Sequence, residues 1–368
     1  MSSKLPRASR ALVLHKSPAD RSPPYHDIAV KEQLIPALQA GQVLVKIAAA
    51  AFNHRELWIR KGLYPRIAFG SVLGADGTGT VVAAADAADP LLQQRVFLTP
   101  MRGWESNPDG PESRFGTLGG AAFPPLGTFT EYVVVDRGEV IATPAHLTDE
   151  QAAAWPLAGV TAWRCVIARA PGTRASVLIT GIGGGVALQA LQLCRAMGAD
   201  VYVTSGSQAK IDRAVALGAR GGVLYSDADW PAALGVLLTR DKCTHLDAVI
   251  DSAGDEILRK TGGVLKLGGR VVCYGMTAAP TVSMSMREVM RNQQLIGTAM
   301  GSRADLHAAT AFLAAHRLVP VVAAVLSGLG VEAAEEGFEM MKRGAQFGKI
   351  VIRVADLDGA SACGEARL

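Results

Sequence analysis

The residues best suited to bind a charged ligand are the glycines that follow the apolar segment 176–180. Gly181, Gly184 and Ala187 stand three residues apart, with Gly185 and Val186 between the last two. Glycine lets a backbone turn tightly and approach a pyrophosphate, whose charge is met by free N–H groups at the start of a helix. The pattern predicts a dinucleotide phosphate-binding turn between a strand and a helix. The alternative is an ordinary tight turn that packs a helix on a sheet.

The next expected strand, residues 200–204, indicates which dinucleotide the turn would bind. NAD-binding units carry an Asp or Glu about 20 residues beyond the first glycine, where it accepts from the ribose 2′-hydroxyl. This chain has Ser205 and Ser207 there instead, followed by Lys210 and Arg213. Small hydroxyls and nearby cations suit a 2′-phosphate, so we expect NADP(H). The alternative for the two cations is that they are solvated charges on a helix surface.

The elements that must position these residues form two domains, because the 368-residue chain exceeds what one core usually supports. The first part is β-rich, and its expected strands are residues 11–15, 42–50, 77–84, 95–99 and 128–135. After residue 149, strands alternate with helices. The expected strands there are residues 176–180, 200–204, 222–225, 246–251, 270–274 and 294–297. We therefore predict an α/β protein with a six-stranded parallel sheet covered on both faces.

Composition excludes several classes of partner. Charged residues make up 19% of the chain and the net charge is +4, so neither nucleic acid nor an anionic membrane is expected. The apolar stretches are too short to span a bilayer, and the N-terminus lacks a secretory h-region. The five cysteines form no C-x-x-C pair, as is typical of reduced thiols inside a cell. We expect a small-molecule substrate.

Two segments and the C-terminal tripeptide carry separate expectations. Residues 101–125 are long for a connection, and such loops are often lids or disordered. The tail 355–368 has few bulky apolar groups, and we expect it to be mobile. The chain ends Ala366-Arg367-Leu368, which is similar to a peroxisomal signal. We expect a cytoplasmic protein, with a peroxisomal location as the alternative.

Five segments together resemble the medium-chain dehydrogenase/reductase superfamily. They are Asn53-His54-Arg55-Glu56, residues 73–79, residues 127–132, the glycine turn and residues 347–351. Within the superfamily, the chain is similar to the quinone oxidoreductase and zinc-free alcohol-dehydrogenase-like branch. The resemblance implies a GroES-like catalytic domain at residues 1–154 and 303–354, a Rossmann domain at 155–302, and a homodimer built across the Rossmann sheet edges.

The same resemblance implies further contacts with the cofactor. They are Thr161, Tyr225, Ser252, Gly254, Gly275, Met276, Met300, Gly301, Ser302 and Lys349. Most of them follow predicted strands, and ligands of open parallel sheets bind beyond the carboxyl ends of the strands. For Gly254 and Gly275 the alternative is an ordinary turn glycine.

The chain departs from the zinc alcohol dehydrogenases of this superfamily at their metal ligands. Their Gly-His-Glu is replaced by Gly74-Ala75-Asp76, and Phe52-Asn53-His54 stands where their zinc cysteine falls. Tetrahedral zinc needs three protein ligands, usually Cys, His or a carboxylate. His54 is a conceivable remaining ligand, but a lone His near a strand end is more often a structural residue. We therefore predict that no metal is bound.

Without a metal, the reaction must be one that needs little stabilisation of an alkoxide. Quinones and α,β-unsaturated carbonyls delocalise the charge left by hydride addition, so modest donors suffice. We expect an NADPH-dependent reductase of such compounds, with Asn53 as amide donor and Tyr64 as phenolic donor. Asn53 also fits a helix N-cap, since Glu56 follows three residues later, and Tyr64 also fits simple packing. The alternative functions are an oxidoreductase of unactivated alcohols or ketones and a non-catalytic NADPH-binding protein.

Overall fold

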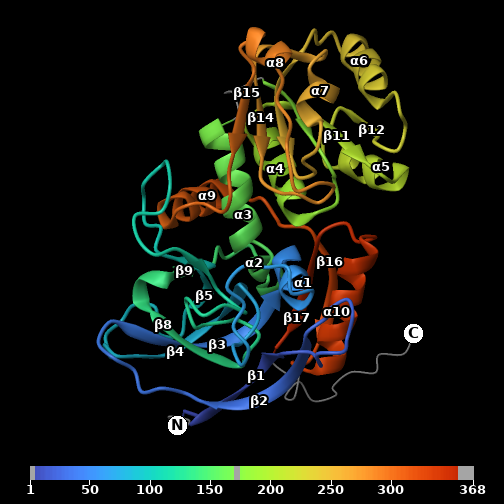
Figure 1. Cartoon of the computed structure of the whole chain (residues 1–368). Helices are drawn as coiled ribbons and strands as arrows, with labels where there is room; N and C mark the ends of the chain where they lie inside the picture. The colour runs from blue at the N-terminus through green and yellow to red at the C-terminus, as the bar shows by residue number, and fades with distance from the viewer. Residues whose placement is uncertain (1–4, 170–174, 355–368) are drawn as a thin grey trace, which may run out of the picture.

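Two large sheets organise the chain, and the helix α3 (Pro156–Trp163) lies between them (Figure 1). The computed structural model describes residues 5–169 and 175–354. In the described part, no helix is long and apolar enough to cross a membrane. The expected mobile tail and the terminal tripeptide lie outside the described residues.

The six-stranded sheet is entirely parallel, which confirms the predicted α/β architecture. Its strands in spatial order are β12 (Gly221–Leu224), β11 (Asp200–Ser205), β10 (Ser176–Ile179), β13 (Leu246–Asp251), β14 (Leu265–Cys273) and β15 (Gln294–Gly297). From β10 the chain adds β11 and β12 on one side of that strand, and it then returns to add β13 on the other side. The switch in direction between β10 and β13 is where open parallel sheets bind nucleotides.

Helices cover both faces of this sheet (Figure 1). They are α4 (Gly185–Ala196), α5 (Gln208–Ala216), α6 (Trp230–Arg240) and α7 (Ile257–Thr261), while α8 (Met286–Met290) lies at the end of the sheet and α3 and α9 (Arg303–Ala315) lie toward the other domain. After α3 the chain continues as a π-helical segment over Arg164–Arg169. The sequence pattern did not predict this wider turn.

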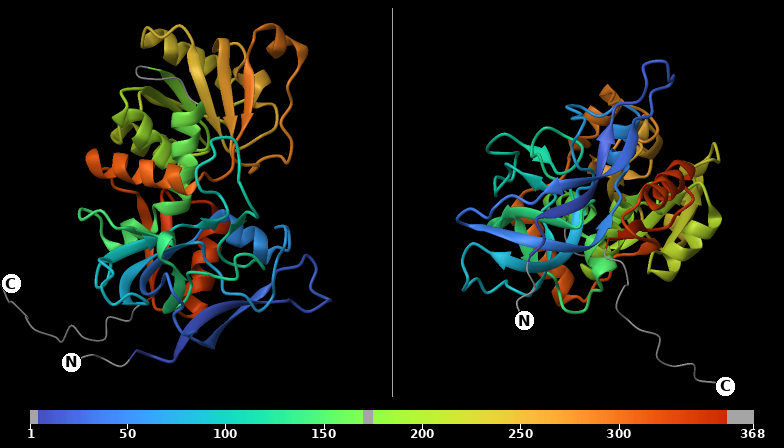
Figure 2. Two further views of the ribbon diagram at one scale, coloured as in Figure 1. Left: turned by 90° about the vertical axis from the view of Figure 1, so that its left-hand side faces the viewer. Right: turned by 90° about the horizontal axis from the view of Figure 1, so that it is seen from below.

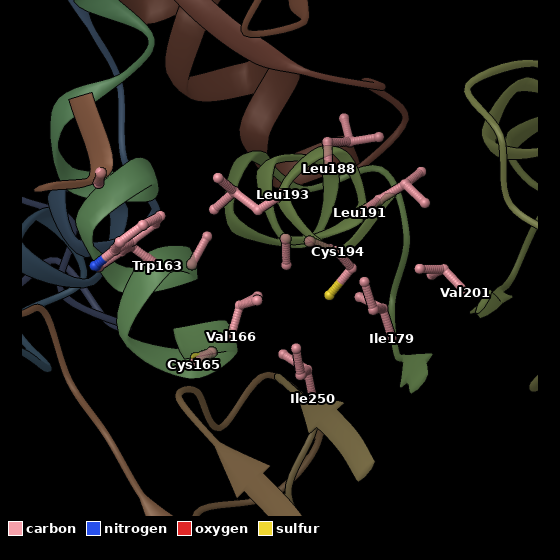
Figure 3. Close-up of a cluster of buried hydrophobic side chains, with 14 of the residues drawn as sticks. Trp163, Cys165, Val166, Ile179, Leu188, Leu191, Leu193, Cys194, Val201 and Ile250 are labelled. Carbon is pink, nitrogen blue, oxygen red and sulfur yellow. The ribbon is translucent and has the colours of Figure 1, made fainter. Parts of the chain in front are cut away.

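The core beside the nucleotide turn is built around α4 (Figure 3). On α4, Cys194 points toward Ile179 and Leu191 toward Val201 on the sheet, whereas Leu188 lies on the opposite side of the helix and belongs to the same buried cluster. Each fully buried leucine contributes about 1.5–3 kcal/mol. This packing fixes the first turn of α4 on the end of β10.

Helix α9 adds a second layer to the same core. Leu306, Ala309 and Leu313 are fully buried and belong to the cluster that includes α4 and β10. The expected domain boundary at residue 302 assigns α9 to the other domain, whereas its apolar face packs on α3 and the Rossmann side. In space, α9 therefore ties the two parts together.

The other domain contains a seven-stranded mixed sheet. Its spatial order is β16 (Val322–Ser327), β17 (Lys349–Arg353), β3 (Gln42–Ala51), β4 (Asp76–Ala84), β5 (Arg95–Leu98) and β9 (Val140–Ala142), while β8 (Tyr132–Asp136) also pairs with β3. Val43, Val45 and Ile47 of β3 are buried in its core, and Leu44 on the opposite face of the strand is buried as well. The short helices α1 (His54–Arg60) and α2 (Asp149–Ala153) and the longer α10 (Val331–Arg343) complete the domain.

An antiparallel ribbon of β1 (Ala8–His15) and β2 (Asp27–Leu34) projects at the end remote from the parallel sheet (Figure 2). The sequence analysis predicted only part of β1 and neither β2 nor β9. The strand expected at 128–135 begins at Tyr132, because Thr128 and Phe129 instead bond to the segment around Leu73 and Gly74.

The segment 101–125 is an ordered loop with a short hairpin, not the disordered segment that its length suggested. Within it, β6 (Met101–Arg102) pairs with β7 (Gly116–Thr117). The backbone carbonyl of Trp104 accepts the N–H of Arg303 at 2.9 Å, which attaches the loop to the start of α9. The Glu112 carboxylate accepts three backbone N–H groups of residues 105–107, and these bonds lower the pKa of Glu112 to about 2.

Candidate nucleotide and catalytic site

The glycine turn has the geometry of an anion cradle. Gly181 and Gly183 have φ of +63° and +129°, a region that side chains rarely adopt. Gly184 is the N-cap of α4, and Gly185 and Val186 form its first turn. A Cβ added at Gly184 would meet no atom within 4 Å, so space is open in front of the free N–H groups of the helix. These residues fit a pyrophosphate.

Asp251 locks the ends of β10 and β13 together beside this turn, although sequence reasoning did not single it out. Its carboxylate accepts from Thr180 Oγ1 at 2.6 Å and from the Gly254 N–H at 2.7 Å. Burial raises the pKa of Asp251, and these hydrogen bonds oppose that rise. The lock places Ser252 Oγ 3.1 Å from where a Cβ of Gly181 would stand. The only sequence signal for Asp251 was its place at the end of a predicted strand.

The residues expected around the adenosine end follow β11 and β12. Ser205 Oγ accepts the Ser207 N–H at 3.2 Å. The Tyr225 hydroxyl lies over Gly206, 2.6 Å from where its Cβ would be. These groups lie close together at the carboxyl ends of the two strands.

Lys210 takes a different course from the one expected of a free phosphate ligand. Its side chain crosses Gly183, and its Nζ donates to the carbonyl of Gly344 at 2.7 Å. Gly344 is the left-handed C-cap of α10, so the bond joins the two domains. Burial and the neighbouring Arg213 lower the pKa of Lys210.

The remaining predicted cofactor residues form two groups. Gly275 packs against Ser252: a Cβ added at Gly275 would stand 3.0 Å from the carbonyl oxygen of Ser252. The adjacent Met276 is exposed. In the second group, Gly301 packs on Val160 of α3. The structure thus brings Gly254, Gly275 and Met276 to the switch point.

The second group lies between α3 and α9 and already has structural partners. Thr161 Oγ1 donates to Leu157 O at 2.8 Å within α3. Ser302 is the N-cap of α9, where its Oγ accepts the Asp305 N–H at 3.0 Å. Met300 precedes it with φ of +60°. These contacts position the helices whatever further role the residues have.

The segment 347–349 connects the glycine turn to the other domain. The Gly348 N–H donates to Gly183 O at 2.9 Å. The aliphatic stem of Lys349 covers Gly185, with Cδ 2.7 Å from the position of an added Cβ. A larger residue at Gly185 would displace this stem.

Beyond that stem, the Lys349 ammonium lies in a buried polar cluster. Its Nζ donates to Phe52 O at 2.6 Å, Asn53 Oδ1 at 2.6 Å and Asp76 Oδ2 at 3.1 Å. Asn53 Nδ2 donates to Asp76 Oδ2 at 2.9 Å. The other carboxylate oxygen of Asp76 accepts the Leu157 N–H at 2.8 Å, at the start of α3. Asp76 is fully buried, and Lys349 and Asn53 keep 5% and 7% of their surface.

Asn53 is also the N-cap residue of α1, as its sequence context suggested. Its backbone N–H donates to Glu56 Oε2 at 2.6 Å. Burial raises the pKa of Glu56, and the charges of Arg55 and Lys349 oppose that rise. The side-chain amide of Asn53 bonds with Asp76 and Lys349. Asn53 can therefore serve as the N-cap residue through its backbone and as an amide donor through its side chain.

Tyr64 stacks with Arg55, whose guanidinium carbon lies 4.8 Å from the ring centroid. Arg55 in turn donates to the carbonyls of Leu118 and Gly119. His54 is exposed, with its ring edge toward Trp58. No hydrogen bond among the described residues joins Tyr64 or His54 to Asn53.

A catalytic zinc does not fit the cluster around Asn53. The ligand positions inferred from sequence hold an amide and a carboxylate, and a lysine ammonium lies between them. Zinc is bound by Cys, His and carboxylate groups, and a cation beside an ammonium would be repelled. Over residues 5–169 and 175–354, no group of three His, Cys, Asp or Glu side chains could hold a metal ion.

Comparison with known proteins identifies relatives for both domains. A family model described as an alcohol dehydrogenase GroES-like domain matches residues 39–145, and one described as a zinc-binding dehydrogenase matches residues 185–315. The zinc-type alcohol dehydrogenase-like protein YogA of Leptosphaeria maculans is 41% identical over 342 residues, which cover 90% of this chain and 95% of that protein.

Two further matches extend the comparison. Acryloyl-coenzyme A reductase of Metallosphaera sedula is 26% identical over 332 residues, covering 88% of this chain and 95% of the relative. The crystal structure of an NAD-dependent alcohol dehydrogenase superposes with a TM-score of 0.80 at 29% identity, covering 94% of this chain and all of that one. Both matches span the two domains together.

Proposed function

The chain belongs to the medium-chain dehydrogenase/reductase superfamily, and on that premise we propose that it is a zinc-independent, NADPH-dependent reductase of quinones or α,β-unsaturated carbonyl compounds. The broader class is established by the relatives: the protein is an oxidoreductase that uses a nicotinamide cofactor. The proposal concerns which nicotinamide it prefers, which acceptors it reduces and how it does so without a metal.

The choice of NADPH rests on the groups around the ends of β11 and β12. Ser205 and Ser207 stand where a carboxylate would repel a 2′-phosphate, and Lys210 is the first cation along α5. The open space before Gly184 accommodates the pyrophosphate. When bound, the reduced nicotinamide supplies the hydride, while this chain holds the phosphates and the acceptor.

One observation carries the choice of acceptor, namely the Lys349 ammonium between Asn53 and Asp76. A ketone that receives hydride becomes an alkoxide, which zinc would stabilise as a Lewis acid. Here the local cation already donates its three protons to Phe52, Asn53 and Asp76. A conjugated acceptor needs less help, because its charge is spread toward a remote oxygen.

Asn53 is the donor that we assign to that oxygen. One of its two amide protons bonds to Asp76, and the second is free to bond to an acceptor, since the described residues give it no partner. A single oxyanion donor is worth about 2.7–4 kcal/mol in other enzymes. We assign Tyr64 as the phenolic proton donor. The name of the acryloyl-coenzyme A reductase, a conjugated thioester reductase, supports this class of acceptor.

The experiment is steady-state NADPH oxidation with a panel of paired acceptors. We expect kcat/KM for orthoquinones or 2-alkenals to exceed that for simple ketones of similar size at least about a hundredfold, equivalent to about 2.7 kcal/mol. The purified protein should contain no stoichiometric zinc and keep its activity in chelator. Equal rates with simple ketones, or one zinc per chain by elemental analysis, would overturn the proposal.

We further propose a homodimer through the free edge of the parallel sheet. Strand β15 ends the sheet and is largely exposed, and Met286, Met290 and Leu295 expose apolar side chains on and beside it. An unpaired edge with apolar neighbours favours pairing with another strand. Sedimentation should give a dimer, and Met290→Lys should shift it toward monomer. A monomer at all concentrations would contradict this arrangement.

A further inference from the structure

We infer that Lys349 is a positioning residue that fixes the orientation of the Asn53 amide and keeps the cluster around it electrically neutral. This inference rests on the proposed function, because it concerns how Asn53 is made ready to donate to the acceptor oxygen. Lys349 is not assigned any contact with the acceptor. It acts through Asn53.

The hydrogen bonds allow only one orientation of this amide. An ammonium has three donors and no acceptor, so the group that faces it must be an oxygen. Asn53 Oδ1 meets Lys349 Nζ at 2.6 Å, and Nδ2 meets Asp76 Oδ2 at 2.9 Å. A flipped amide would place NH₂ against the ammonium and an oxygen against the carboxylate. Both contacts would then be repulsive.

The fixed orientation leaves one amide proton for a ligand. Nδ2 has two protons, and only the bond to Asp76 uses one of them within the described residues. A cation bonded to the carbonyl oxygen also polarises the amide, which strengthens its remaining N–H as a donor. Lys349 thus affects both the direction and the strength of the donor.

Charge balance gives a second reason for the lysine. Asp76 is fully buried, and Lys349 forms its only salt bridge among the described residues. Without the ammonium, a buried negative charge would lie one hydrogen bond from the amide that must bind a developing anion. That charge would raise the energy of the anion and so slow the reaction.

The ammonium is also placed relative to both domains. Its stem packs on Gly185 in the nucleotide turn, and Asp76 holds the Leu157 N–H at the start of α3. Movement of either element therefore moves the amide. The position of the amide donor is therefore coupled to the nucleotide turn, where the cofactor would bind, without a metal.

The test is a double-mutant cycle with Lys349→Met, Asn53→Ala and the combined variant. Lys349→Met should lower kcat at least tenfold, with KM for NADPH changed less than threefold. The unpaired Asp76 charge would slow the reaction with or without the Asn53 amide, so the cycle is also measured with Asp76→Asn in every variant. There, if Lys349 acts through Asn53, adding Lys349→Met to Asn53→Ala should slow the enzyme no more than twofold. Lys31→Met, an exposed lysine on β2, is the control for loss of charge and should match wild type.

Multiplied losses in the combined variant that also carries Asp76→Asn, or a Lys349→Met enzyme within twofold of wild type, would overturn the inference. If Lys349→Met does not fold because Asp76 is left unpaired, Lys349→Met with Asp76→Asn removes both buried charges together. That pair is then measured with and without Asn53→Ala by the same criterion.

A readout without turnover separates this inference from the proposed function. The side-chain amide resonances of Asn53, identified by their loss in Asn53→Ala, should be resolved and slow to exchange in wild type. They should shift and exchange faster when Lys349 is replaced. A wild type that reduces no conjugated acceptor refutes the proposed function, whereas unchanged amide resonances in the Lys349 variant refute the positioning role.

Discussion

Replacing Lys210 by alanine tests how the chain distinguishes NADPH from NADH. In the structure, Lys210 Nζ donates to Gly344 O at 2.7 Å, so binding a 2′-phosphate requires this bond to be exchanged. The ammonium-to-phosphate bond joins two charged groups and is worth about 3 kcal/mol, whereas the released ammonium-to-carbonyl bond has one charged partner and is worth about 1.5 kcal/mol. The net contribution of Lys210 to the preference is therefore about 1.5 kcal/mol.

That free energy corresponds to a factor of about 10 in relative affinity. Wild type should bind NADPH at least about tenfold more tightly than NADH, as two charge-assisted contacts allow. Lys210→Ala should reduce the ratio of affinities by the stated factor while NADH still binds. The assay is titration of both cofactors by fluorescence or calorimetry at two salt concentrations, because screening weakens charge-assisted contacts.

Lys31→Ala is the matched control, since it removes the same charge from an exposed position on β2. Its ratio of affinities should equal that of wild type. The reasoning is refuted if Lys210→Ala leaves the ratio unchanged, or if it weakens NADH as much as NADPH. In the second case the lysine would serve the contact between domains and not the phosphate.

Two stability predictions follow from buried groups in the GroES-like domain. His26 is buried and bonded to Ser17, and burial lowers its pKa below 6.5, so the folded chain binds fewer protons than the unfolded chain in acid. The stability contributed by neutral His26 is therefore complete above pH 6.5 and is lost as the pH falls. The urea midpoint of wild type should drop between pH 7.5 and 5, and that of His26→Gln should drop less. An equal drop in both proteins would contradict this prediction. Gly79→Ala should destabilise the fold by about 3 kcal/mol or prevent folding, because its Cβ would stand 1.9 Å from Lys46 O. Gly110→Ala, whose Cβ meets nothing within 4 Å, should unfold thermally like wild type, and similar melting of both variants would count against the close contact.

Local patterns made the nucleotide-binding half predictable. The strand, the glycines and the helix around Gly181 are adjacent in sequence, and each signal has a direct steric or electrostatic cause. The alternation of strands and helices then implied a parallel sheet with short, right-handed connections. The observed sheet has the six parallel strands that this alternation implied.

The polar cluster could not be predicted in the same way. Asn53 and Lys349 were both candidate site residues, but nothing in the sequence indicated that their side chains touch. Asp76 lies 23 residues from Asn53 and 273 from Lys349, and no periodicity relates positions so far apart. The contact forms because β17 pairs with β3, although about 300 residues separate the two strands in the sequence.

Docking of the loop at 101–125 was hidden for a related reason. Its composition is polar and rich in glycine and proline, which is typical of mobile segments. Order comes instead from Glu112, which gathers three backbone N–H groups, and from Trp104, which packs beneath the Arg164 guanidinium at 4.5 Å. Neither contact can be read from residue types alone.

The pairing of β3 with β17 also determines when the chain can finish folding during synthesis. One edge of β3 is shared, with residues 42–46 paired to β8 and residues 49–51 paired to β17. The second half stays open while about 300 residues are added, which takes the ribosome about 15–60 s. The glycine turn waits about half as long for the Gly348 N–H, because about 165 residues separate Gly348 from Gly183. A nascent chain with an open strand edge is prone to aggregate, so chaperones should protect it until its last strand emerges.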